Sequence, residues 1–378
     1  MTKDVQVKEK KKREPLLHIT KRAALPLSMS VLIRAVAILA SLLFCAIVTL
    51  LLTGENPISL YVTIFDGAFG NSIRIWRTFQ EIAMLLAVAL ALTPAFKMRF
   101  WNIGGEGQIL IGALATAVCM FYIGDGMPGW ALILTMLVCS LLAGAVWGLL
   151  PAFFKAHFGT NETLFTLMMN YVSIQLVKFF LNVADQSGQS TIGPTELVFG
   201  RLPKIIHPYF LNILIVAVLT VLMYIYLKYT KHGYEISVVG ESENTARYIG
   251  INVKKVILRT MAISGAICGL VGFLLVGGTH YGITVNTADN RGFTAIMVSW
   301  LAKFNPLMMV LTTALIIFMG HGAEEVSTVF GLNSSFADIL TGIILFFIIG
   351  CEFFVQYKVH INRKKKNVGE AADSEEVA

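Results

Sequence analysis

The stretch GESENTARYIGI (Gly240–Ile251) is polar, yet it lies between apolar runs at 208–228 and 257–279 that are each long enough to cross a membrane. The whole chain has the same bias, with 56% hydrophobic residues, 14% charged residues and a mean hydropathy of +0.71 over 378 residues. A soluble domain of this length carries far more charged surface. The sequence therefore predicts an all-α, polytopic membrane protein with a short polar segment between two spans.

The polar stretch itself predicts a short helix over 242–249. Glu241 or Ser242 can cap its start, and Gly250 can end it in the left-handed conformation that glycine adopts easily. About two turns of helix are unstable alone in water, so the helix must dock on something. Two interpretations stay open: an ordinary helix at the membrane surface, or a docking helix for a cytoplasmic partner.

Ten apolar runs extend outward from this stretch and predict about ten transmembrane helices. The runs lie at 31–53, 82–95, 106–123, 129–150, 162–182, 208–228, 257–279, 291–302, 307–321 and 336–355. The runs at 82–95 and 291–302 are shorter than the roughly 20 residues that a span needs, so both are candidates for broken or re-entrant helices. If neither crosses, eight spans remain and both termini still lie on one side.

The distribution of basic residues sets the orientation. Of the 30 lysines and arginines, 8 precede the first run, 5 follow the last, and ten occupy the loops on that same side. Only five lie on the opposite side, and two fall inside runs. Basic residues concentrate on the cytoplasmic side of membrane proteins, so both termini are predicted to be cytoplasmic. The net charge of +7 thus has a membrane explanation, and we expect no nucleic-acid binding.

These patterns divide the chain into three predicted parts. They are a basic cytoplasmic tail (1–30), a transmembrane permease domain (31–355) with a cytoplasmic loop at 229–256, and a cytoplasmic C-terminal tail (356–378). We expect both tails to be disordered, because they are rich in charge and poor in apolar residues.

Two pairs of glycines suggest close helix packing. Gly144 and Gly148 are four residues apart, as are Gly265 and Gly269, so each pair lies on one helix face. Small residues in that pattern let helix backbones approach one another in lipid.

One run carries a polar helical face. Glu162, Thr166, Asn170 and Ser173 recur at i, i+4, i+8 and i+11, with apolar residues between them. Polar groups are costly in lipid and usually face a pathway or a partner. This face either lines a substrate pathway or forms hydrogen bonds that hold the helices together.

A second polar group surrounds a carboxylate. Asn102, Glu106 and Gln108 lie among three glycines, just before an apolar run, and mark a helix start near the cytoplasmic side. Glycine permits tight turns, and a carboxylate at a helix N-terminus is favoured by the helix dipole. The segment is either a structural cap of a broken helix or part of the pathway or a gate.

The sequence contains no sign of catalysis. It has no G-x-x-x-x-G-K-[ST] motif with which to bind ATP phosphates, no cluster with metal-ligand spacing, and no nucleophile with a base. We therefore expect the chain to be no enzyme and to bind neither metal nor cofactor. Any ATP that drives it must be hydrolysed by another subunit.

Four stretches together resemble one family. They are GESENTARYIGI, FWNIGGEGQ (100–108), NETLFTLMMNYV (161–172) and NRGFTAIMVSWLAKFNP (290–306). In this order they look like the ABC importer permeases of the branched-chain amino acid, ribose and nucleoside group. The resemblance covers about residues 30 to 355 and is greatest for the nucleoside-type permeases that work with a BMP-type lipoprotein.

The resemblance implies a type II-like permease in the plasma membrane that imports nucleosides. Its partners would be a cytoplasmic ABC ATPase, a second homologous permease in a heterodimer, and an extracellular substrate-binding lipoprotein. The coupling segment would contact the ATPase through Glu241, Asn244, Ala246, Arg247, Tyr248 and Gly250. Glu241 follows the glycine of the motif at a position where the family varies.

Two other functions remain open. One is a permease for ribose or another simple sugar, because the lipoprotein does much of the substrate selection in such systems. The other is a secondary transporter driven by an ion gradient, which needs an ion-binding site near the middle of the membrane. The acidic residues of this chain cluster toward the ends of the spans, which disfavours that class.

Overall fold

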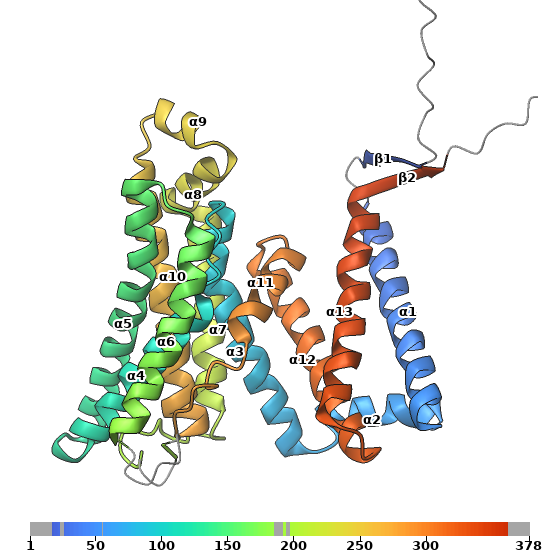
Figure 1. Cartoon of the computed structure of the whole chain (residues 1–378), viewed down its shortest axis with the longest axis horizontal. Helices are drawn as coiled ribbons and strands as arrows, with labels where there is room; N and C mark the ends of the chain where they lie inside the picture. Colours follow the sequence, from blue (N-terminus) through green and yellow to red (C-terminus); the bar gives the residue numbers. More distant parts are fainter. Residues whose placement is uncertain (1–16, 23–25, 55, 185–191, 194–196, 362–378) are drawn as a thin grey trace, which may run out of the picture. The chain divides into compact units, whose positions relative to one another are not determined.

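The computed structural model consists almost entirely of helices in the part of the chain that it describes (Figure 1). The described residues are 17–22, 26–54, 56–184, 192–193 and 197–361. They belong to two compact units, one made of 1–57 with 339–378 and the other of 58–338. Within the described ranges, nine helices are long and apolar enough to cross a membrane, which confirms an all-α polytopic architecture.

The first unit contains helix α1 (Leu27–Thr53) and most of α13 (Ser334–Gln356). Arg34, inside the first apolar run, forms an ion pair with Glu352 at 3.0 Å, so its charge is compensated. The chain next to each helix forms a strand, and β1 (Leu17–Lys21) pairs with β2 (Tyr357–Ile361) in antiparallel register.

This pairing bears on the two predicted tails. The expectation of disorder is wrong for 17–21 and 357–361, because each strand supplies the hydrogen-bonding partner of the other. The pairing also brings these two segments together, and the cytoplasmic location of both tails stays a prediction. The rest of each tail, at 1–16 and 362–378, lies outside the described residues.

The second unit is a bundle around the buried helices α3 and α10. Its helices are α2 (Pro57–Phe69), α3 (Ser72–Lys97), α4 (Gly105–Ile123), α5 (Gly129–Phe158), α6 (Glu162–Ala184), α7 (Phe210–Tyr229), α8 (Lys231–Glu241), α9 (Glu243–Tyr248), α10 (Val253–Leu275), α11 (Arg291–Leu301) and α12 (Pro306–Val329). A 3-10 turn, η1 (Gly124–Gly126), follows α4, and a π turn, η2 (Val276–His280), follows α10. Most of α3 and α10 is inaccessible to solvent, whereas α5, α6, α7 and α12 expose long apolar faces, as helices in contact with lipid do.

The two short apolar runs have different structures. The run at 82–95 belongs to α3, which starts at the Asn71 cap and continues for 26 residues, so the suggestion of a broken helix is wrong there. The run at 291–302 forms α11, which has only 11 residues. At 1.5 Å per residue α11 is about 16 Å long, which is too short to cross a bilayer.

Helix α11 lies parallel to the second half of α3. Its first residue, Arg291, pairs with Glu81, and further along the Oγ of Ser299 donates to the carbonyl of Ala89 at 3.1 Å. The end of α11 therefore lies near Ala89, within the second half of α3.

Residues 281–290 connect the π turn at the C-terminal end of α10 to the start of α11. The start of α11 lies part-way along the bundle (Figure 1). The connecting segment and α11 together fit a tenth passage made by a half-helix. The total of ten passages stays a prediction.

The glycine pairs lie where α5 and α10 touch. A Cβ added to Gly265 would overlap the carbonyl oxygen of Gly144, and one added to Gly269 would overlap that of Ser140. Gly148 lies against the carbonyl of Met261 in the same contact. The close approach expected from the sequence is therefore present.

This contact makes Gly265→Leu a test of the packing. The leucine side chain has no space between α5 and α10, so we expect a loss of about 1–3 kcal/mol in the free energy of unfolding. Gly342→Leu is the matched control, because a Cβ at exposed Gly342 meets nothing within 4 Å. Thermal unfolding of the purified protein in detergent should separate the two variants. Equal melting temperatures would contradict the close contact.

Candidate functional site

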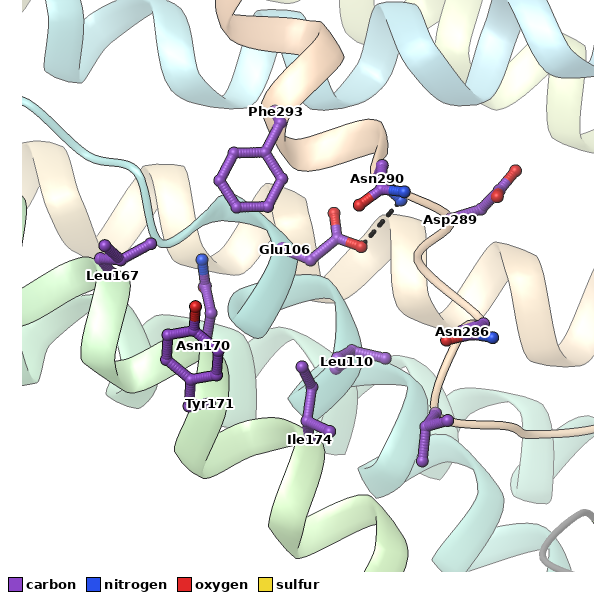
Figure 2. A pocket seen from close by; sticks show the side chains of 11 residues that line it. Glu106, Leu110, Leu167, Asn170, Tyr171, Ile174, Asn286, Asp289, Asn290 and Phe293 are labelled. Carbon is purple, nitrogen blue, oxygen red and sulfur yellow. Dashed lines mark hydrogen bonds between the residues drawn. The ribbon is translucent and has the colours of Figure 1, made fainter. Parts of the chain in front are cut away.

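The polar centre of the second unit is the carboxylate of Glu106, in the first turn of α4 (Figure 2). One carboxylate oxygen accepts a hydrogen bond from the backbone N–H of Asn290, and the other accepts from Gly292, both at 2.9 Å. Glu106 is only 8% exposed. Since these donors lie at the start of α11, the Glu106 side chain caps that helix, where the dipole favours a negative charge.

Glycines allow the two helix starts to touch. A Cβ added to Gly292 would overlap the backbone of Glu106, so no larger residue fits there without a shift of the backbone. A Cβ at Gly105 would press against the side chain of Leu92 on α3. The glycines flanking Glu106 thus serve close packing as well as a turn.

An ion pair lies next to this contact. The guanidinium of Arg291 is buried and pairs with Glu81 on α3, and the exposed Asp289 lies 3.6 Å from the same guanidinium. Sequence reasoning placed Arg291 in an outer loop and assigned no role to Glu81. The signal it missed was a pair of opposite charges at the starts of the two short apolar runs, because such charges need one another in a membrane.

The polar face of α6 packs against the chain that leads into α4. The amide of Asn170 donates to the carbonyl of Ile103 at 3.0 Å and accepts from the N–H of Gly107 at 2.8 Å. The hydroxyl of Thr166 accepts from the N–H of Ile103 at 3.2 Å. These bonds satisfy the backbone of Ile103, which precedes α4, and the N–H of Gly107 in the first turn of α4, which would otherwise lack partners.

The other predicted pathway residues also have partners within the chain. The hydroxyl of Ser173 donates to the carbonyl of Asn170 at 2.7 Å, and Glu162 forms an ion pair with Lys155 at 2.8 Å. Asn102 and Gln108 exchange side-chain hydrogen bonds at 3.3 and 3.4 Å.

A cavity of about 320 Å³ opens beside Glu106, between α4, α6 and the start of α11 (Figure 2). Of the seven residues expected along a pathway, only Glu106 and Asn170 lie on its wall. The pathway role of all seven stays a prediction. Glu106 and Asn170 are the two of them that line the cavity.

The opening stretch of the sequence forms the short helix α9. The hydroxyl of Ser242 caps it by accepting from the N–H of Thr245 at 3.2 Å, and Gly250 follows it with a φ of +86°. Helix α8, which precedes α9, was not expected. Its signals were a possible Thr230 cap and the spacing of buried Ile236 and Val239.

The faces of α9 differ. Ala246 is fully buried and packs into an apolar cluster of the bundle, whereas Arg247 and Tyr248 point outward, with Tyr248 92% exposed. Glu241 and Asn244 are also exposed. Ala246 therefore contacts the chain's own core, so its small size keeps α9 close to the bundle.

Comparison with known proteins agrees with this architecture. The family model described as "Branched-chain amino acid transport system / permease component" matches residues 74–349. The chain belongs to this family. It is a multi-pass ABC transporter permease of the plasma membrane, and the nine long apolar helices in the described ranges agree with this.

Three curated relatives match over most of their own length. The guanosine ABC transporter permease protein NupP of Bacillus subtilis is 30% identical over 84% of this chain and 92% of its own. The glucose permease TsgB13 of Haloferax volcanii is 26% identical, with 86% and 89% covered. The nucleoside permease NupB of Lactococcus lactis is 28% identical, with 84% and 90% covered.

The Glu106 cap can be tested with Glu106→Gln. A carboxamide offers one acceptor oxygen in place of two, so the N–H of Asn290 or of Gly292 loses its partner. We expect a loss of about 1–3 kcal/mol in stability, and reduced uptake by the assembled transporter. Glu324→Gln is the control, because Glu324 is exposed and lies 3.8 Å from its exposed partner Arg77. If Glu106→Gln unfolds at the wild-type temperature in detergent, the cap contributes nothing.

Proposed function

We propose that this chain is the permease subunit of an ABC importer that brings nucleosides into the cytoplasm. The observation that carries the proposal is α9, a capped helix that rests on the bundle through Ala246 and presents Arg247 and Tyr248 outward. An exposed tyrosine beside an arginine is the composition of an interface anchor.

The energy for transport comes from a separate subunit. The sequence has no phosphate-binding motif, so we infer that the chain itself catalyses nothing and that a cytoplasmic ABC ATPase hydrolyses the ATP. The ATPase would bind α9 and its surroundings, with Glu241 and Asn244 at the edge of the contact. It can shift the permease between inward-open and outward-open states only if its contacts differ between those states.

Nucleosides are the favoured substrate class. The relatives NupP and NupB are named for guanosine and nucleosides, and the sequence resembles the nucleoside-type permeases. The relative TsgB13 is named for glucose, so a simple sugar is the second candidate. Direct binding of guanosine and of glucose to the cognate lipoprotein distinguishes the two, since that protein would deliver the substrate.

The complete importer would contain further subunits. We propose a second, homologous permease that completes the pore with this chain, and an extracellular lipoprotein that binds the substrate. Glu106 and Asn170 would face the substrate route. Asn102, Gln108, Glu162, Thr166 and Ser173 would support it through the hydrogen bonds and the ion pair described above.

The coupling contact predicts the effect of Tyr248→Ala. Removal of an exposed interface ring should weaken co-purification of the ATPase about tenfold and lower uptake in parallel, with normal insertion in the membrane. Arg247→Ala should act in the same direction. Tyr229→Ala is the control, because Tyr229 is equally an exposed tyrosine but ends α7. If the ATPase binds Tyr248→Ala and Tyr229→Ala equally well, α9 is not the docking helix.

A single cysteine tests where α9 lies. Asn244→Cys, in a background without the five natural cysteines, should form a crosslink to the ATPase, because Asn244 is exposed on α9. Labelling of this cysteine by a membrane-impermeant reagent from outside intact cells would overturn both the orientation and the coupling role.

A further inference from the structure

We propose that the cavity beside Glu106 is a contact site for the nucleoside on its way through the permease. The rings of Tyr171 and Phe293 would contact the base, and the amides of Asn286 and Asn290 would bind the ribose. This inference rests on the proposed function and names residues of the substrate route that lie outside the polar motifs of the sequence.

The shape and lining of the cavity suit a small polar molecule. Its volume of about 320 Å³ lies at the lower end of the range of small-molecule sites. In Figure 2 the rings of Tyr171 and Phe293 lie to the left of Glu106, and the side chains of Asn286 and Asp289 lie to its right. The two rings thus lie on one side of Glu106, and Asn286 and Asp289 lie on the other, which would suit the base and the ribose of a nucleoside.

The cavity lies at membrane depth. Arg291, at the start of α11, pairs with Glu81, which is the tenth residue of the 26-residue helix α3. The non-helical segment just before it, with Asn286 and Asn290, is therefore well inside the span of α3. Irregular backbone at that depth is stable only when it is buried or lines a water-filled space. Since both asparagines are exposed, we infer that they face water.

The two asparagine amides are available for a ligand. Within the described part of the chain, neither side-chain amide has a hydrogen-bond partner, although the backbone of each residue does. Each amide offers one acceptor and two donated hydrogens, which match the hydroxyls of ribose. Asp289, on the same segment, adds an acceptor for a hydroxyl.

The two rings are likewise open. Tyr171 is 59% exposed and Phe293 is 40% exposed, and among the described residues neither stacks on another ring. Planar bases stack on aromatic side chains with little dependence on their identity. Such a surface discriminates weakly among bases, which suits a route that many nucleosides share.

A polar stripe on α6 continues from the cavity. Tyr171, Gln175 and Lys178 follow at i, i+4 and i+7, and all three are exposed on a membrane-spanning helix. In the described residues, the ammonium of Lys178 has no carboxylate within 4 Å. Groups of this kind are costly against lipid, so the stripe faces a water-filled route.

The test uses the complete importer in proteoliposomes and follows uptake of radiolabelled guanosine and uridine. Tyr171→Ala, Phe293→Ala and Asn286→Ala are compared with Phe179→Ala, a control on α6 that is equally exposed but outside the cavity. We expect each cavity variant to lower uptake about fivefold, as the loss of one ring contact or of one hydrogen bond would. Loss of a ring should affect guanosine more than uridine, because the purine has the larger face. Co-purification of the ATPase and the second permease should not change.

A photoreactive azidoguanosine gives a second measurement that does not depend on the variants. It should label the peptides that contain Tyr171 or Phe293 in the wild-type importer. If the wild type imports guanosine, but the cavity variants transport like Phe179→Ala and the label lies elsewhere, the site is wrong and the proposed function stands. If the variants instead lose the second permease, the cavity is a subunit interface. If the wild type imports no nucleoside, the proposed function fails, and the site with it.

Discussion

The centre of this permease depends on one carboxylate that joins two helix starts. Helix α11 begins inside the bundle, so its first N–H groups need partners that lipid cannot supply there. Glu106 provides them with two hydrogen bonds of 2.9 Å. The reverse also holds, because a buried carboxylate is stable only when it is hydrogen-bonded. Each group therefore removes the cost of burying the other, and the contact fixes the position of the half-helix.

The same logic extends to α6. The chain leading into α4 is not helical, and its backbone groups are satisfied by Thr166 and Asn170 from α6. That face of α6 mainly holds the bundle, with Asn170 also at the cavity wall, while the adjacent stripe beginning at Tyr171 stays exposed. One helix thus presents two polar faces with different tasks. The first is buried and hydrogen-bonded, and the second is free to meet a solute.

Local signals predicted much of the fold, and long-range contacts explain what they missed. The cap at Ser242, one of the two expected candidates, and the stop at Gly250 are set by neighbouring residues, which is why local signals found them. Helix α3 is longer than its apolar run because its first turns contain Arg74 and Arg77, which hide a helix from a hydropathy search. Asn290, a partner of Glu106, lies 184 residues away in the sequence. The spacing of polar and apolar residues along a helix cannot predict a contact between residues so far apart. The inward face of α9 is similarly decided by packing around Ala246.

The packing also supplies a continuous route from α9 to the cavity. Gly240, at the end of α8, lies against the carbonyl of Lys97, where α3 ends. Helix α3 then runs beside α11, and Glu81 contacts Arg291 at the far end of that pair. Spatial continuity alone does not couple two sites, because one element along the route must have two stable arrangements. Helix α11 is the element best suited to this, since it is short and its start is held by a few polar contacts. A shift of α3 that weakened the bonds between Glu106 and α11 would move Asn290 and Phe293 together, and in the proposed importer this would link the ATPase contact at α9 to the cavity wall.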